Sequence, residues 1–198
     1  MQTLQSKINT KTQVFKDNRE GMLELLKTLD KHLEDSRFQG AEKHIERARS
    51  KGKFLARERI DLLLDQDSPF LELLPLAGLG GKGFGTGGTS VGGIGIVSGR
   101  LVMVISNVGT NKSGSIDFAT LQKAMRLNEI AEENELPSIN LVESSGANLP
   151  EQAKIFNLGG TNFRDITRRS KKGIPSISVV FGNATAGGAY IPGMSDYS

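Results

Sequence analysis

PSINLVESSGA (residues 137–147) and PSISVVFGNATAGG (residues 175–188) are two copies of one arrangement, in which a proline precedes an apolar strand and the strand runs into a glycine turn. The copies begin 38 residues apart, and the sequence between them is mostly helical in pattern. Near-continuous apolar strands joined by helical crossovers are typical of an α/β sheet that is covered on both faces. Ligands bind at the carboxyl ends of the strands in such sheets, and both glycine turns fall there.

The sequence around these copies continues the α/β pattern from residue 67 onward. Short apolar runs predict further strands at residues 70–74, 94–97 and 101–105. Ser98-Gly99-Arg100 lies between the last two runs and predicts a hairpin turn. Residues 115–134 have the apolar spacing of a helix that begins near Asp117. We therefore expect one domain over residues 67–198.

Residues 1–66 have a different pattern, that of a helical amino-terminal arm. Apolar side chains recur every three or four residues within a helix predicted over 18–34, at Met22, Leu25, Leu26, Leu29 and Leu33. Two shorter helices are predicted at 41–51 and 55–65, and the polar cluster at 65–69 ends the helical pattern. Because each helix is apolar on one side only, we expect the arm to lie on another surface.

Composition and charge narrow the class of protein. The 37% hydrophobic and 24% charged residues are typical of a globular protein, and no apolar run approaches the roughly 20 residues that cross a bilayer. The amino terminus resembles neither a secretory signal nor a transit peptide, so we expect a cytoplasmic protein without a membrane span. The net charge of +3 comes from the arm, where acids and bases alternate as on a solvated helix face rather than a nucleic-acid surface.

The sequence offers few groups for conventional catalysis. There is no cysteine, and the only histidines, His32 and His44, lie in the arm and are interpreted as surface residues. The absence of an HExxH motif or a comparable spacing predicts no catalytic metal. The glycine-rich segment 78–89 fits neither a phosphate loop nor a dinucleotide turn, which favours a mobile surface loop, with a phosphate cradle as the alternative.

The two glycine turns are the stronger candidates for a site. Glycine lets a backbone approach a ligand closely, and a turn that leads into a helix leaves N–H groups unpaired. Two such turns at adjacent strand ends could direct two N–H groups at one oxygen, which would form an oxyanion hole. On these residues alone, two tight structural connections are the alternative interpretation.

Three stretches of the chain resemble the carboxyltransferase (beta) subunits of biotin-dependent acyl-CoA carboxylases. They are RARSKGKFLARERIDLLLD (47–65), LVESSGANLPEQ (141–152) and residues 173–196, which end in TAGGAYIPGMSD. The resemblance implies a crotonase-like (ClpP/crotonase) fold for residues 67–198. It implies an oxyanion hole built from the backbone N–H groups of Gly146, Ala147, Gly187 and Gly188. It also implies substrate contacts by Ser145, Asn148, Ala186 and Ala189.

The same resemblance implies a reaction. The family moves a carboxyl group from carboxybiotin, supplied by a biotin carboxylase/biotin carrier (alpha) subunit, to an acyl-CoA, and biotin itself accepts the substrate proton. Asn148 after Gly146-Ala147 resembles the branch that acts on methylcrotonyl-CoA or geranyl-CoA, with propionyl-CoA or acetyl-CoA as the alternative. An enoyl-CoA hydratase would be expected to place a glutamate just beyond the second turn, where this chain has Ala189 and Tyr190.

The family also implies an incomplete site. Its members have a second crotonase-like domain, and their active site forms between subunits of a homo-oligomer. We therefore expect the domain to be incomplete at its carboxyl end and the isolated chain to be inactive, with a non-catalytic acyl-CoA-binding or assembly fragment as the alternative. Two sets of cations could meet the phosphates of CoA, or could be solvated clusters: Arg47 and Lys53, and Arg164, Arg168, Arg169, Lys171 and Lys172.

Overall fold

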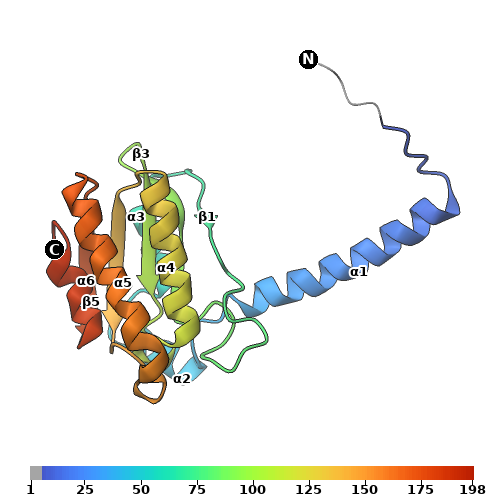
Figure 1. The fold of residues 1–198 in the computed structure, drawn as a ribbon. Helices are drawn as coiled ribbons and strands as arrows, with labels where there is room; N and C mark the ends of the chain where they lie inside the picture. The colour runs from blue at the N-terminus through green and yellow to red at the C-terminus, as the bar shows by residue number, and fades with distance from the viewer. Residues whose placement is uncertain (1–5) are drawn as a thin grey trace.

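The computed structural model of the protein describes residues 6–198 as one α/β domain with a projecting helix (Figure 1). Its elements are α1 (Gln13–Asp35), α2 (Glu42–Arg49), α3 (Ala56–Leu63), β1 (Leu71–Glu72), β2 (Ser90–Val97), β3 (Arg100–Asn107), the short 3-10 turn η1 (Lys112–Gly114), α4 (Phe118–Glu133), β4 (Ser138–Ser144), a second 3-10 turn η2 (Leu149–Glu151), α5 (Gln152–Lys171), β5 (Ser176–Ala184) and α6 (Gly187–Met194). None of these helices combines the length and the apolar content that crossing a bilayer requires.

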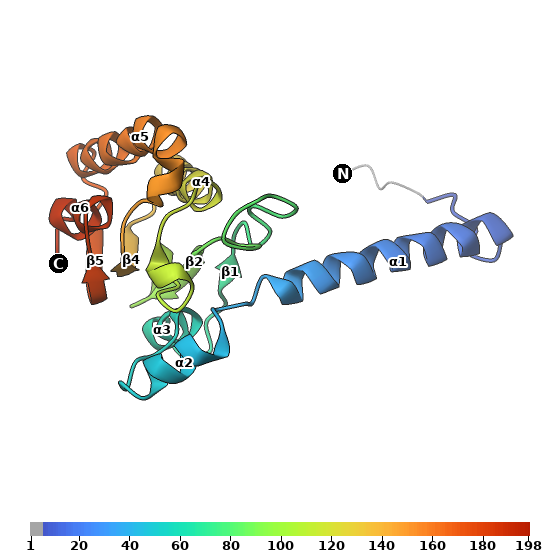
Figure 2. The same cartoon turned by 90° about the horizontal axis from the view of Figure 1, so that it is seen from below.

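The sheet confirms the predicted relation between the two repeated copies. Its five strands follow the order β1-β2-β3-β4-β5, with antiparallel pairing from β1 to β3 and parallel pairing from β3 to β5. β4 and β5 are the two copies, and Ser138 pairs with Ser176, so the two prolines stand level. Helices α4, α5 and α6 cover one face of the sheet, and α2 and α3 cover the other (Figure 2).

The hairpin between β2 and β3 also follows its sequence signal. Ser98 and Gly99 both have positive φ, 51° and 73°, which is the geometry of a two-residue turn that matches strand twist. The carboxylate of Asp65 accepts both of their N–H groups at 2.7 Å. The polar cluster that ends the helical arm therefore also fixes this turn.

Two of the differences in extent between predicted and observed elements have a clear local cause. The strand expected at 70–74 is reduced to Leu71–Glu72, because Leu74 takes a left-handed φ of 54° and turns the chain away from the sheet. The helix expected at 115–134 begins at Phe118, because Asp117 is its N-cap and accepts the N–H of Thr120 at 2.9 Å.

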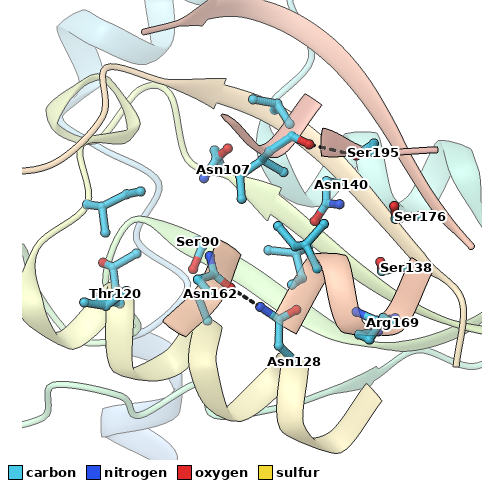
Figure 3. Close-up of a pocket in the computed structure, with 17 residues that line it drawn as sticks. Ser90, Asn107, Thr120, Asn128, Ser138, Asn140, Asn162, Arg169, Ser176 and Ser195 are labelled. Carbon is cyan, nitrogen blue, oxygen red and sulfur yellow. Dashed lines mark hydrogen bonds between the residues drawn. The ribbon is translucent and has the colours of Figure 1, made fainter. Parts of the chain in front are cut away.

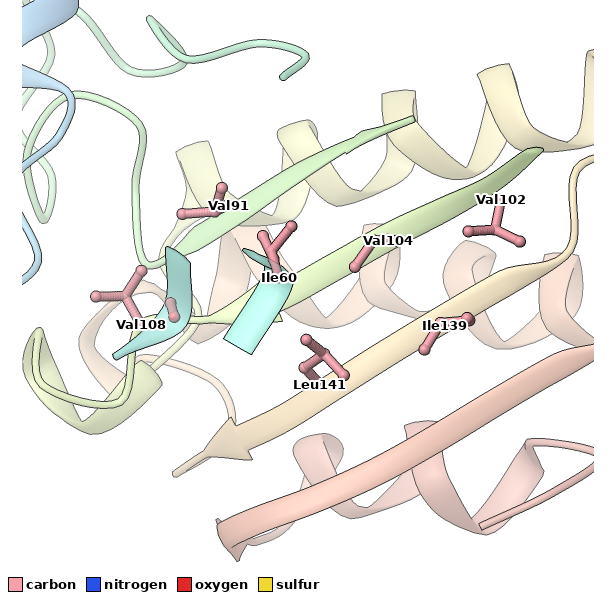
Figure 4. Close-up of a cluster of buried hydrophobic side chains, with 8 residues drawn as sticks. Ile60, Val91, Val102, Val104, Val108, Ile139 and Leu141 are labelled. Carbon is pink, nitrogen blue, oxygen red and sulfur yellow. The ribbon is translucent and has the colours of Figure 1, made fainter. Parts of the chain in front are cut away.

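The hydrophobic core includes one of the arm helices, α3, but not α1. Ala56 and Ile60 of α3 are buried against the sheet in a cluster with Val91, Val102, Val104, Val108, Ile139 and Leu141 (Figure 4). In contrast, α1 has no buried residue and extends away from the domain (Figure 1). Met22 and Leu25 are 57% and 66% exposed. Within residues 6–198, the surface that we expected to cover the apolar face of α1 is therefore absent.

Candidate functional site

The structure brings the two glycine turns into contact at the carboxyl ends of β4 and β5. Gly146 has a φ of 86°, and a Cβ placed on it would lie 2.8 Å from the carbonyl oxygen of Thr185 and 3.6 Å from the nitrogen of Gly187. The N–H of Thr185 in turn donates to the carbonyl of Ser144 at 3.1 Å. Gly146 is thus a position where only glycine permits the close approach of the second turn.

In the first turn, most backbone donors are already engaged. The N–H of Gly146 donates to Oγ of Ser144 at 3.1 Å, and the N–H of Asn148 donates to the carbonyl of Ile116 at 2.8 Å. The N–H of Ala147, between them, has no acceptor within residues 6–198. Ala147 is half-buried.

In the second turn, too, some backbone N–H groups are engaged and others are not. Gly188 and Ala189 donate their N–H groups to the carbonyls of Thr185 and Ala186 at 2.9 and 3.0 Å. Among the described residues, the N–H groups of Ala186 and of Gly187, which is at the first position of α6, are left without an acceptor. Ala186 has φ 48° and ψ −126°, a conformation that ordinarily belongs to glycine. Such strain of about 1–3 kcal/mol is found where a fold holds a functional turn in one shape.

The eight residues predicted for the site therefore have unequal roles in the structure. Gly146 and Gly188 use their N–H groups internally, whereas Ala147 and Gly187 each present a free one. The exposed residues Ser145, Ala186 and Ala189 lie in the same two turns. Asn148 is half-buried, and its side-chain amide donates to Glu151 at 3.3 Å.

A strained loop supports the first turn, and it was missed in the sequence. Lys112, Ser113 and Gly114 have consecutive positive φ values of 49°, 56° and 64°. The carbonyl of Ser113 accepts the N–H of Ser145 at 3.0 Å, and the carbonyl of Gly114 accepts the hydroxyl of Ser144 at 2.7 Å. Left-handed geometry at non-glycine residues has no periodic signal, so only the Gly at 114 could have indicated this loop.

A cationic pocket opens beside this loop, on the face of the sheet covered by the arm. Its cationic side chains are Arg47, Lys51, Lys53 and Arg59, and His44, Thr110, Ser113, Glu143 and Asn183 also line it. The arm cations named from the sequence, Arg47 and Lys53, thus line a pocket that also includes Ser113, whose carbonyl accepts an N–H of the first glycine turn. The α5 set does not, since Arg164 and Arg168 line an outer groove against α4.

Glu143 is the acidic group of this pocket. Its carboxylate lies 2.5 Å from Nζ of Lys53 and 2.5 Å from Nη2 of Arg59. Burial raises the pKa of Glu143, but hydrogen bonds and positive charge from Lys53 and Arg59 outweigh burial and hold the pKa below its ordinary value. The carboxylate is therefore ionised at neutral pH.

The acid nearest in sequence to the second turn is not placed for proton transfer there. Asp196 lies at the opposite end of β5, where its carboxylate accepts the N–H of Ser176 at 2.7 Å and the hydroxyl of Ser170 at 2.8 Å. The backbone hydrogen bond from Ser176 lowers the pKa of Asp196. Within the described residues, no group of three or more His, Cys, Asp or Glu residues could hold a metal ion.

A further cavity lies between the sheet and helices α4 and α5 (Figure 3). Polar side chains such as Asn128, Asn140 and Arg169 line it together with Ser138 and Ser176 at the starts of β4 and β5. No residue predicted for the oxyanion hole or for substrate contact lines this cavity. Ile116, which also lines it, exchanges backbone hydrogen bonds with Gly146 and Asn148 of the first turn.

The sheet covered on both faces, with paired glycine turns at adjacent parallel strand ends, defines the crotonase-like class of folds. The family model described as carboxyl transferase domain matches residues 47–198. The chain therefore belongs to the carboxyl transferase domain family.

Individual relatives agree with this membership. A probable biotin-dependent acyl-coenzyme A carboxylase beta2 subunit of Mycobacterium tuberculosis is 47% identical over 194 residues, which cover 98% of this chain and 36% of that protein. A probable mitochondrial methylcrotonoyl-CoA carboxylase beta chain of Drosophila melanogaster is 45% identical over 200 residues, covering 98% and 35%. The crystal structure of the P. aeruginosa geranyl-CoA carboxylase beta subunit superimposes with a TM-score of 0.79 at 39% identity, covering 98% and 37%. The chain thus spans about a third of the length of these relatives.

Proposed function

We propose that the chain forms the acyl-CoA side of a carboxyltransferase site in a biotin-dependent acyl-CoA carboxylase. The proposed reaction moves a carboxyl group from carboxybiotin, presented by a biotin-carrying partner subunit, to a branched enoyl-CoA such as 3-methylcrotonyl-CoA. The observation that carries the proposal is the pair of free N–H groups at Ala147 and Gly187, in two turns that contact each other. The names of the methylcrotonoyl-CoA and geranyl-CoA relatives support the substrate class.

The proposed mechanism depends on charge at the thioester oxygen. Removing a proton from the reacting carbon delocalises negative charge onto that oxygen, and the carbanion would then form a bond to the carboxyl carbon. For the step to balance, the bond between that carbon and the biotin nitrogen would break, and the freed biotin would take up the substrate proton. The N–H groups of Ala147 and Gly187 would stabilise the oxygen as its charge develops. The loss of one such donor typically costs about 3–4 kcal/mol of transition-state stabilisation. Carboxybiotin supplies the carboxyl group when the partner presents it.

The cationic pocket supports CoA as the carrier of the acyl group. Arg47 and Lys51 line this pocket and are exposed, and both would be available to phosphate oxygens. Arginine in particular can contact phosphate with two parallel hydrogen bonds. A nucleotide moiety held there would lead its thioester arm past Ser113 toward the first glycine turn, whose Ser145 hydrogen-bonds to that residue.

The arrangement of acids favours carboxyl transfer over hydration of an enoyl-CoA. Hydration needs an acid and a base at the reacting carbons. In this chain Ala189 and Tyr190 follow the second turn, and Asp196 is bound at the other end of β5.

The first test is the Ala147→Pro substitution in the gene product that contains these residues, combined with its biotin-carrying partner. Proline deletes the proposed donor, so incorporation of radiolabelled bicarbonate into 3-methylcrotonyl-CoA should fall by about 100-fold or more. Ala147→Gly is the matched control, because it keeps the N–H and should stay within a few-fold of the parent rate. Equal rates for the proline and glycine variants, with intact folds, would refute the oxyanion assignment. Acyl-CoA binding without any transfer by the parent protein would favour a binding or assembly role.

A further inference from the structure

Glu143 connects the arm to the strand that carries the first glycine turn. It is the second-last residue of β4, directly before Ser144, whose hydroxyl accepts the N–H of Gly146. Its two carboxylate oxygens bind Lys53, between α2 and α3, and Arg59, in the middle of α3. One side chain therefore joins two points of the cationic pocket wall to the end of β4.

Two glycines leave room for this carboxylate. A Cβ placed on Gly109, beyond β3, would lie 2.6 Å from Cδ of Glu143, and one placed on Gly182 of β5 would lie 2.6 Å from its Oε1. The neighbours on both sides of β4 thus lack side chains where Glu143 needs room. The carboxylate is confined to the position from which it reaches both cations.

Because Arg59 is buried, breaking this ion pair should cost more free energy than breaking an ion pair on the surface. The side chain of Arg59 is only 4% exposed, and its guanidinium lies over the ring of Phe181 at 4.5 Å. Within the described residues, its Nε and Nη1 have no hydrogen-bond partner, so Glu143 is its one ionic contact. A buried charge whose partner is removed is strongly destabilised, so Arg59 and its surroundings would rearrange without the Glu143 charge.

We propose that Glu143 is a positioning residue. By binding Lys53 and Arg59 it holds the arm segment that carries the exposed pocket cations Arg47 and Lys51 at a fixed place relative to the oxyanion turn. This inference rests on the proposed function, because it assigns the cationic pocket to the nucleotide part of an acyl-CoA. Glu143 touches neither the thioester nor the reacting carbon in this scheme. It acts through Lys53 and Arg59, so its effect depends on whether the substrate carries phosphates.

The test compares two substrates in the assembled carboxylase, an acyl-CoA and the matching S-acyl-pantetheine, which lacks the nucleotide and all phosphates. Glu143→Gln should raise KM for the acyl-CoA about tenfold and leave kcat/KM for the acyl-pantetheine within about twofold. Glu72→Gln is the matched control, because Glu72 pairs with Arg57 of the same helix but does not line the pocket. The Glu72→Gln variant should keep the parent KM for the acyl-CoA and the parent kcat/KM for the acyl-pantetheine.

The outcomes separate this inference from the proposed function. An unchanged KM for the acyl-CoA, or equal losses with both substrates, would overturn the positioning role. If Glu143→Gln fails to assemble, the double variant Arg59→Met/Glu143→Gln removes both buried charges and should show the same dependence on phosphate. Calorimetric titration with CoA alone should show about tenfold weaker binding by the Glu143→Gln variant. A parent enzyme that binds CoA but carboxylates no acyl-CoA would refute the proposed function and would leave this titration to decide on Glu143.

Discussion

At the residue scale, the second glycine turn contains two adjacent glycines with different surroundings. Gly188 donates its N–H to Thr185, and a Cβ on it would lie 3.2 Å from Cβ and Oγ of Ser144, so it is a packing position. Gly187 has no atom near its missing Cβ and no backbone acceptor within residues 6–198. Its N–H is therefore free for a ligand, and it occupies the first helical position, where proline is well tolerated.

This difference yields a matched pair of variants. Gly187→Pro loses the donor, which we expect to lower kcat about 100-fold to 1000-fold in the assembled carboxylase. Circular dichroism must show an intact fold, because Ala186, with φ 48° and ψ −126°, lies outside the extended region that a following proline favours. Gly187→Ala keeps the N–H and should stay within a few-fold of the parent, because the added methyl group meets nothing within 4 Å. Steady-state rates of carboxylation of one acyl-CoA would decide. Full activity of the proline variant would show that the N–H of Gly187 is not the second donor.

The sequence located the two turns but could not choose among their four predicted donors. The choice depends on partners far along the chain, such as the carbonyl of Ile116 that accepts the N–H of Asn148. Glu143 stands out in the sequence only as part of a motif, because its contacts include Lys53, 90 residues earlier. Local sequence patterns predict where the turns lie. Which backbone N–H groups are left without an acceptor depends on residues that only folding brings close.

At the element scale, helix α4 was predictable because Asp117 is a strong N-cap and its apolar residues have helical spacing. Its least expected member is Lys123, which is 2% exposed. The ammonium of Lys123 donates to the carbonyls of Gly87 and Ser90 at 3.1 and 2.7 Å. It thereby fastens the end of the glycine-rich segment to the helix. The segment forms turns and a loop, but Gly87, Gly88 and Thr89 at its end are buried, so this part does not fit the predicted surface loop.

Lys123 should make stability depend on pH in a defined direction. Burial lowers its pKa from 10.5 to about 8 in the folded protein. Below pH 8 the fold must hold a buried charge that water solvates in the unfolded chain, so the penalty is fully present there. It disappears as the pH rises from 8 to 10.5, which corresponds to a gain of about 3 kcal/mol.

The measurement compares the parent with Lys123→Met by urea denaturation across this pH range. Methionine cannot titrate, so the difference in unfolding free energy between the two proteins should shift in favour of the parent as the pH rises. Other groups titrate equally in both proteins and cancel. A constant difference between pH 7 and 10.5 would show that Lys123 does not lose its proton in this window.

At the scale of the whole molecule, the helices of the arm have similar sequence patterns but different environments, since α3 is part of the core and α1 is exposed. Helices α1 and α3 both show an apolar stripe, and the stripe alone does not say which surface covers it. In the structure, Ala56 and Ile60 of α3 lie in the same cluster as Val104 and Leu141, whereas α1 buries nothing. Periodicity therefore predicted the helices well, and only tertiary packing could assign them to the core or to solvent.

Two truncations of aliphatic side chains in the arm test this division. Ile60→Ala should lower the free energy of unfolding by about 2–5 kcal/mol, because Ile60 is 1% exposed and its loss leaves a cavity in the core. Leu25→Ala in α1 should change it by less than about 0.5 kcal/mol, because Leu25 is 66% exposed. Chemical denaturation of the chain at low concentration would measure both values. A cost for Leu25→Ala that approaches the Ile60→Ala value would mean that a surface outside residues 6–198 or a second copy covers α1, because the domain itself offers it no contact to lose.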